Sequence, residues 1–282
     1  YDAFGSRAFG SWDGQMPYSP YIPGRVTPFP LMWDGSSPSY YTDDWNPGTD
    51  FRVYSPQVQT MNWVFMQREA LKLNPNFRFN FSLWNGEEYN SKRSEQYQPK
   101  PDYYRSLRQT YNPTRYAGFA QFGLWLLRPR VMREYRGTAS DLTSMEPYFH
   151  ALENVVDHVY KNKTLQKFWR KGELVPNRAH QHPYHFGIPN EYKNVDRWFL
   201  LDTNLDAPRP WKLDTEIPVF SLALVEGDKG NRRWLVYAHS SLQDRQGVVI
   251  TIPDYGKITV NVSMGGTFYT VDEKSKKVYP VL

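Results

Sequence analysis

The segment FRFNFSLWNGEEY, residues 77–89, alternates large apolar side chains with polar ones and then becomes acidic. One face of an extended chain here carries Phe77, Phe79, Phe81 and Leu83. The other face carries Arg78, Asn80, Ser82 and Trp84. A period of two residues is the pattern of a β-strand, so this segment is predicted to be a strand with one polar face. Glu87 and Glu88 follow it, either as solvated turn acids or as carboxylates delivered to an active site.

The segments around this strand predict further regular elements. Ser55 and Pro56 form a helix-start signal, and apolar residues at helical spacing then predict a helix over about 56–73. The apolar run RYAGFAQFGLWLL, residues 115–127, is interpreted as a second, buried strand. Helical spacing returns over 149–169, with room for a break. Strands that alternate with helices indicate a parallel α/β fold.

The C-terminal part of the sequence has a different texture. From Ile217 onward, short β-rich runs are separated by Gly, Asp and Asn turns, and these runs are IPVFSLALV, RRWLVYAHS, GVVITIP, KITVNVS and GTFYTV. They predict a small antiparallel β-sandwich. Residues 1–50, in contrast, are so rich in Pro, Gly, Ser and Tyr that they indicate long surface loops.

Composition narrows the classes of function. Aromatic residues make up 17% of the chain, with 10 Trp, 21 Tyr and 16 Phe, and such rings stack on sugars or bases or fill a core. The net charge is +5, but Lys and Arg are dispersed among acids, so we expect no nucleic-acid partner, whereas an anionic polymer fits. No apolar run reaches the roughly 18 residues that a membrane-spanning helix needs, so no membrane-spanning helix is expected. Without Cys, neither disulfides nor thiolate metal ligands can form.

The order of these elements resembles the C-terminal end of a (β/α)8-barrel glycoside hydrolase of the retaining clan A type, a group that includes agarase-like and β-galactosidase-like polysaccharide hydrolases. The resemblance implies an α/β plus all-β fold. Its expected parts are a barrel portion over 1–175 with long aromatic loops, a connecting segment over 176–215, and a β-sandwich over 216–282. FRFNFSLWNGEE resembles the seventh barrel strand and YAGFAQFGLWLL the eighth.

The resemblance also implies a chemistry for the acidic turn. In clan A enzymes the seventh strand ends in the nucleophilic glutamate, and Glu87 or Glu88 occupies the corresponding place. Retention requires a second carboxylate about 5 to 5.5 Å away. In the family this acid/base lies on the fourth strand, usually after an Asn, and nothing before residue 50 resembles four strands and four helices. We therefore expect an N-terminal portion of the same polypeptide to complete the barrel, because a half barrel leaves sheet edges exposed.

Several other residues are candidates for contact with a sugar. Trp84 and Trp125, near the ends of the two interpreted strands, fit either an aromatic floor under a sugar or barrel packing. Trp33 and Asp34 lie in the aromatic loops, where a carboxylate can bind sugar hydroxyls, serve as the missing acid, or cap a turn. The same three interpretations apply to Asp13, Asp43 and Asp44.

Two clusters of basic or metal-binding residue types remain. Arg128 begins a series with Arg130, Arg133 and Arg136 just past the interpreted eighth strand. These guanidinium groups suit a substrate carboxylate or sulfate, or they pair with acids such as Glu134. His182 lies between His180 and His185, and we favour sugar contact or loop packing there over a metal.

The expected function is hydrolysis of a β-linked polysaccharide, with an acidic or sulfated one as an option, by two carboxylates with retention. Two alternatives stay open: a non-catalytic carbohydrate-binding protein, and a polysaccharide lyase that uses Tyr with His or Arg. No cofactor is expected. The location implied by a polysaccharide substrate is secreted or periplasmic.

Overall fold

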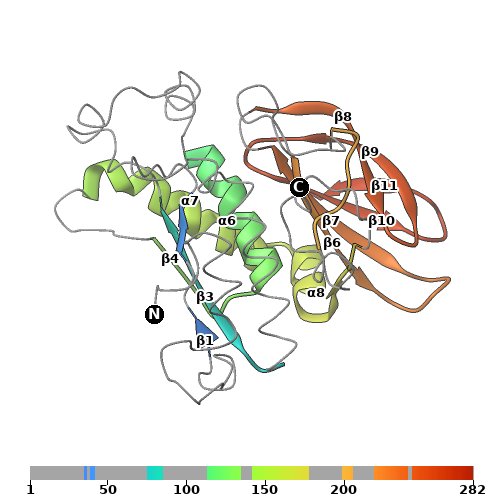
Figure 1. Cartoon of the computed structure of the whole chain (residues 1–282), viewed down its shortest axis with the longest axis horizontal. Helices are drawn as coiled ribbons and strands as arrows, with labels where there is room; N and C mark the ends of the chain where they lie inside the picture. The colour runs from blue at the N-terminus through green and yellow to red at the C-terminus, as the bar shows by residue number, and fades with distance from the viewer. Residues whose placement is uncertain are drawn as a thin grey trace, which may run out of the picture. The chain divides into compact units, whose positions relative to one another are not determined.

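The computed structural model describes residues 35–36, 39–41, 75–84, 113–134, 142–177, 199–205, 219–240 and 243–281. Together they show a mixed fold of helices, parallel strands and antiparallel sheets (Figure 1). The chain divides into two compact units. The first comprises Tyr1–Tyr111 and Leu127–Glu146, and the second comprises Asn112–Leu126 and Pro147–Leu282.

The first unit contains a parallel sheet built around one central strand. Its strands are β1 (Gly35–Ser36), β2 (Ser39–Tyr41), β3 (Arg78–Trp84) and β4 (Val131–Glu134). β1 and β2 pair with β3 in one continuous register, from Gly35 opposite Arg78 to Tyr41 opposite Trp84. β4 pairs with the same stretch of β3 that β2 does, so it lies on the opposite edge.

The alternation that predicted β3 is present in the structure. Phe81 and Leu83 are fully buried, and Phe77, just before the strand, is 2% exposed. Arg78 and Asn80, which alternate with them, are exposed. The prediction of a strand with one apolar and one polar face is therefore confirmed.

The predicted strand over 115–127 is wrong, because this segment is the helix α6 (Pro113–Leu127). The helix is almost entirely buried, so apolar residues occupy all of its sides. Such a helix lacks the polar stripe from which a helical period is recognised in a sequence. Thr114 is the only β-branched residue in it, and Pro113 occupies the first position, where proline favours a helix. The strand that pairs with β3 in parallel after this helix is instead β4.

The predicted helical segment over 149–169 is confirmed, together with its break. It comprises α7 (Leu142–Lys161) and α8 (Lys163–Lys171), separated by Asn162. Asn162 caps α8, since its Oδ1 accepts hydrogen bonds from the amides of Thr164 at 2.9 Å and Leu165 at 3.1 Å. The helix predicted over 56–73 lies outside the described residues. None of the described helices combines the length and the apolar character that crossing a bilayer requires.

The second unit is built on an antiparallel sheet in the order β11-β10-β7-β6-β5. Its strands are β5 (Glu173–Leu174), β6 (Val219–Glu226), β7 (Arg233–Ser240), β10 (Thr267–Asp272) and β11 (Val278–Val281). A separate antiparallel hairpin consists of β8 (Arg245–Ile252) and β9 (Gly256–Val262). All five β-rich runs of the C-terminal sequence are therefore strands, as predicted, whereas β5 and β11 are short additions.

Both faces of this sheet are covered, which explains why β6 and β7 are almost continuously buried. On one face, Phe119 and Phe122 of α6 pack against Phe220, with ring centroids 5.7 and 5.9 Å apart. On the other face, the hairpin closes a core that includes Ala223 and Ile250. The unit thus differs from the expected sandwich over 216–282, because a helix from the middle of the chain forms one of its layers.

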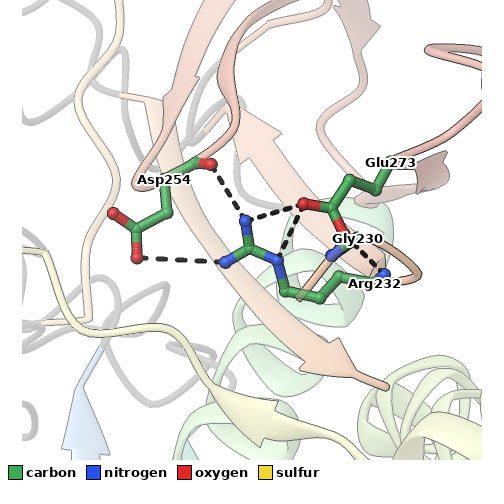
Figure 2. Close-up of polar contacts among 4 residues, drawn as sticks. All are labelled: Gly230, Arg232, Asp254 and Glu273. Carbon is green, nitrogen blue, oxygen red and sulfur yellow. Dashed lines mark hydrogen bonds and ion pairs between the residues drawn. The ribbon is translucent and has the colours of Figure 1, made fainter. Parts of the chain in front are cut away.

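One end of this unit is held together by a single arginine (Figure 2). Arg232, before β7, donates two hydrogen bonds to Oε1 of Glu273 at 2.9 and 3.2 Å, while Oε2 of Glu273 accepts from the amides of Gly230 and Arg232. Arg232 also donates to the carbonyl of Asp254 at 3.3 Å. Three hairpin turns therefore meet at one guanidinium. These bonds, those from Arg232 first, lower the pKa of Glu273 to about 2.

Candidate functional site

The strongest candidate site is the edge of the parallel sheet at which its strands end. β2 ends at Tyr41, β3 at Trp84 and β4 at Glu134. Tyr41 is the register partner of Trp84, and Glu134 is the partner of Leu83, so the three ends lie within one residue of each other along the sheet. In α/β folds, ligands bind at this carboxyl-terminal edge because the loops that follow the strands converge there.

Trp84 is the only predicted site residue that the described structure places at this edge. Glu87 and Glu88 follow it by three and four residues in the sequence, and they lie outside the described residues. Trp33, Asp34 and His182 also lie outside them. The same holds for the weaker candidates Asp13, Asp43, Asp44, His180 and His185.

Trp125 does not lie at the end of a strand, because it belongs to α6. Its side chain is fully buried, and its Nε1 donates to Oε1 of Gln121 at 3.2 Å. The ring packs edge-on against Trp169 and Phe268, with centroids 5.3 and 5.6 Å away. Of the two interpretations given to Trp125, the contacts agree with core packing, although the core belongs to the second unit.

The arginine series was expected to follow a strand over 115–127, but that segment is a helix and the series straddles β4. Arg128 and Arg130 come before β4, at the amino end of that strand and away from the edge where Trp84 lies. Arg128 has a positive φ of 44°, just after α6 ends. Arg133, in contrast, lies inside β4, one residue before its carboxyl end, and is exposed. Arg136 lies outside the described residues.

One face of the parallel sheet is polar and exposed, and we call it the polar face. Parallel register partners lie on the same face, and Arg133 is paired with Ser82, as is Ser39. Among the residues whose side chains the structure describes, alternation places Arg78 and Asn80 of β3 and Val131 and Arg133 of β4 on the polar face. The side chains of Arg78, Asn80, Val131 and Arg133 are exposed.

An exposed face is unusual for parallel strands, which are normally covered on both faces. Val131 is 49% exposed on it, although its type belongs in a core. Within the described residues, the polar face therefore carries both charged and apolar side chains that are exposed.

Sequence reasoning missed two residues at this edge. It treated Glu134 only as an acid that pairs with the arginines, and it left Tyr41 among the loops. The signal for β4 was the change from the apolar run of α6, through Pro129, to the short segment Val131–Glu134. β1 and β2 are too short to give a pattern of their own.

The most perturbed histidine of the described residues lies elsewhere, beneath α6. His239 of β7 is fully buried, and its ring stacks on Phe220 at 5.0 Å and meets Phe119 edge-on at 4.8 Å. Burial, and secondarily the charge of Arg115, lower the pKa of His239 to about 3. His239 is therefore a neutral core residue near pH 7. Separately, the described residues include no group of three or more His, Asp or Glu side chains that could hold a metal ion.

No protein-family model, no curated protein and no solved structure matches this chain.

Proposed function

We propose that this chain provides the carboxyl-terminal part of a (β/α)8-barrel glycoside hydrolase that cleaves a β-linked polysaccharide with retention. In this proposal β3 is the seventh barrel strand and β4 the eighth, and an N-terminal portion of the same polypeptide supplies the remaining strands. The observation that carries the proposal is that, in the sequence, Glu87 and Glu88 come three and four residues after the end of the central strand of a parallel sheet.

The order of elements supports a βα repeat. Among the described elements, the helix α6 lies in the sequence between β3 and its parallel neighbour β4, and α7 follows β4, although α6 packs within the second unit. Parallel neighbours joined through a helix are the unit from which (β/α)8 barrels are built. In such barrels the catalytic residues follow the carboxyl ends of the strands, which is where the Asn-Gly-Glu-Glu sequence comes after Trp84.

The chemistry assigned to these residues needs one ionised and one protonated carboxyl group. Glu87 or Glu88, ionised, attacks the anomeric carbon, while the second carboxyl group protonates the departing glycosidic oxygen. The same second group then takes a proton from water, which displaces the glutamate from the sugar and regenerates the enzyme. Trp84 supplies a ring for stacking on the sugar at this edge. Because a polysaccharide is too large to enter a cell, we place this activity in a secreted or periplasmic protein.

Replacement of the two glutamates tests the assignment. In Glu87→Gln or Glu88→Gln, whichever removes the nucleophile should lower kcat by at least about 10³-fold, measured as reducing ends released from a panel of β-linked polysaccharides. The matched control is Glu153→Gln on α7, because Glu153 is exposed and contacts only a neighbouring histidine in the described structure.

The panel also separates the other functions. A product that absorbs in the near ultraviolet and arises without water would show a lyase. Binding of a polysaccharide that stays uncleaved, with both glutamine variants binding as the parent does, would show a carbohydrate-binding protein. Either result rejects the hydrolase.

A further inference from the structure

We infer that the helix α8 carries a surface that binds an anionic polysaccharide, one with sulfate or carboxylate groups along its chain. Four cationic side chains form this surface, which we call the basic surface: Lys163, Lys167, Arg170 and Lys171. It belongs to the second unit, whereas the proposed catalytic edge belongs to the first. The inference therefore adds a binding site to the proposed function, and it rests on that function only for the choice of a polysaccharide as the polymer.

The arrangement of α8 is the first step. Leu165 and Phe168 are fully buried and hold one side of the helix within the second unit. The basic surface lies on the other side, because its residues are spaced i, i+4, i+7 and i+8 along the helix. Each of these residues is exposed, and the rise of the helix spreads them over about 12 Å. A row of cations of this length suits an extended polyanion better than a single small ion.

The unbalanced charge of the basic surface is the second step. Lys167 binds Glu226 at 2.6 Å, but Glu226 is also 3.7 Å from Arg233, so one carboxylate is shared between two cations. Within the described structure, the other cations of the basic surface form no ion pair. Glu173, the nearest acid in the sequence, is the register partner of Val225, which packs on the face of the sheet that the hairpin covers. Excess positive charge of this kind attracts an anionic polymer.

The surroundings of the basic surface are the third step, and they favour a sugar polymer over a membrane. An amphipathic helix binds a membrane by burying its apolar side among the lipids, and in α8 that side is already packed against the protein. Tyr160, in the last turn of α7, is 74% exposed. Its carbonyl accepts a hydrogen bond from the side chain of Gln166, so Tyr160 lies beside α8. An exposed aromatic ring next to cations suits a sugar unit that carries an anionic group.

The test compares one polymer with and without its charge. The probes are carrageenan, the same carrageenan after chemical desulfation, and polygalacturonate, and the measurement is the Kd for each by isothermal titration calorimetry at one fixed salt concentration. The 282-residue protein should bind carrageenan or polygalacturonate at least about 10-fold more tightly than the desulfated polymer.

Replacement of the three unpaired cations tests the basic surface itself. The triple variant Lys163→Gln, Arg170→Gln, Lys171→Gln should bind the charged polymer about 10- to 100-fold more weakly, because several exposed ionic contacts are lost together. Its affinity for the desulfated polymer should equal that of the parent.

A second triple variant is the matched control. Lys229→Gln, Lys257→Gln, Lys274→Gln removes the same charge from exposed positions of the second unit outside α8, and it should bind as the parent does. Glutamine is about as good a helix former as lysine and arginine, and every replaced side chain is exposed. Both triple variants should therefore unfold at the parent's midpoint temperature.

The possible results separate this inference from the proposed function. If the α8 variant binds the charged polymers as the parent does, or if the control variant loses as much affinity, the inference fails, and the hydrolase stands wherever cleavage depends on Glu87 or Glu88. If the α8 variant loses affinity but neither glutamate affects cleavage, the inference stands and the hydrolase fails.

Two further probes test the class of partner. The parent should bind a single-stranded oligonucleotide of matched charge, and vesicles that contain phosphatidylserine, more weakly than the charged polysaccharide. Equal or tighter binding of either one rejects a polysaccharide as the partner of the basic surface. If no polysaccharide is bound or cleaved, both proposals fail.

Discussion

At the scale of single residues, the most informative side chain outside the candidate site is His239. Both of its ring nitrogens are buried and have no hydrogen-bond partner within the described structure. The groups that face it are the rings of Phe119, Phe122, Phe220 and Tyr237 and the charge of Arg115. Protonation of His239 would therefore place a positive charge among aromatic rings and near the cation Arg115.

The buried, apolar surroundings of His239 predict that the folded protein loses stability at acidic pH. The pKa of His239 falls from 6.5 to about 3 in the folded state, so below pH 6.5 the unfolded chain binds a proton that the folded chain does not. Stability should decrease as the pH falls from 6.5 toward 3, by about 2 to 3 kcal/mol at pH 4.5. His239→Phe removes the titrating group and loses no hydrogen bond, so its free energy of unfolding should depend less on pH.

Urea unfolding at pH 7.5 and pH 4.5 measures the effect. The difference in unfolding free energy between His239→Phe and the parent should be larger at the lower pH. If the difference is the same at both pH values, folding does not lower the pKa of His239, and the prediction is wrong.

At the scale of elements, α6 is attached to the antiparallel sheet at a point that admits no side chain. The hydroxyl of Tyr237 donates to the carbonyl of Gly118 at 2.5 Å, and both are buried. A Cβ atom on Gly118 would lie 2.1 Å from the carbonyl oxygen of Met264. Glycine is therefore required by the close approach of two backbones, although it is a poor helix former.

The substitution Gly118→Ala should change the stability of the protein through two opposite effects. Helix propensity alone would stabilise the variant by about 1 kcal/mol, whereas overpacking in a close-packed core costs about 1 to 3 kcal/mol, and more where backbone must move. Because the contact is with backbone, the clash should win, and we expect a net loss of about 2 kcal/mol in thermal or urea unfolding. Ala117→Ser, which adds one atom at the neighbouring half-buried position, should change stability far less.

A gain in stability for Gly118→Ala would show that α6 does not approach the segment at Met264 so closely. Tyr237→Phe then separates the packing from the hydrogen bond, since it should cost about 1 kcal/mol through the loss of the bond to Gly118 alone.

The elements also show which parts of the fold the sequence could predict. β8 and β9 are half-exposed strands that alternate in burial, and turns separate them, so their pattern is complete within the local sequence. α6 has no such pattern, because other elements bury it on nearly all sides. That one ambiguity placed a strand over 115–127 instead of Val131–Glu134, and with it misplaced Trp125 and the arginines. Trp84 was placed correctly, because it belongs to a strand with one exposed face.

At the scale of the whole molecule, the chain passes between its two units three times. It leaves the first unit before Asn112, returns at Leu127, and leaves again after Glu146. α6, which lies between β3 and β4 in the sequence, supplies buried aromatic rings to the sheet of the second unit. The β-rich part is therefore not an appended module that can be separated at residue 216.

Truncation tests this connection. A chain that ends at residue 215 lacks β6, β7 and β10 and would expose Phe119, Phe122 and Trp125, all of which are now fully buried. Large exposed apolar patches promote association, so the truncated chain should aggregate or bind a hydrophobic dye strongly. A monodisperse, folded product in size-exclusion chromatography and circular dichroism would contradict it, and the 282-residue protein is the control.

The hydrogen bonds of Arg232, which join three hairpin turns, should make this end of the protein resistant to proteolysis. A protease cleaves a segment that has locally unfolded and binds in its active site in an extended conformation. Exposed hairpin turns are preferred cleavage sites. Here Glu273 accepts hydrogen bonds from Arg232 and from the amides of Gly230 and Arg232, and Arg232 also donates to the carbonyl of Asp254. These bonds connect the three turns, so opening one turn requires breaking bonds to another. Digestion should accordingly spare this end of the protein and begin elsewhere.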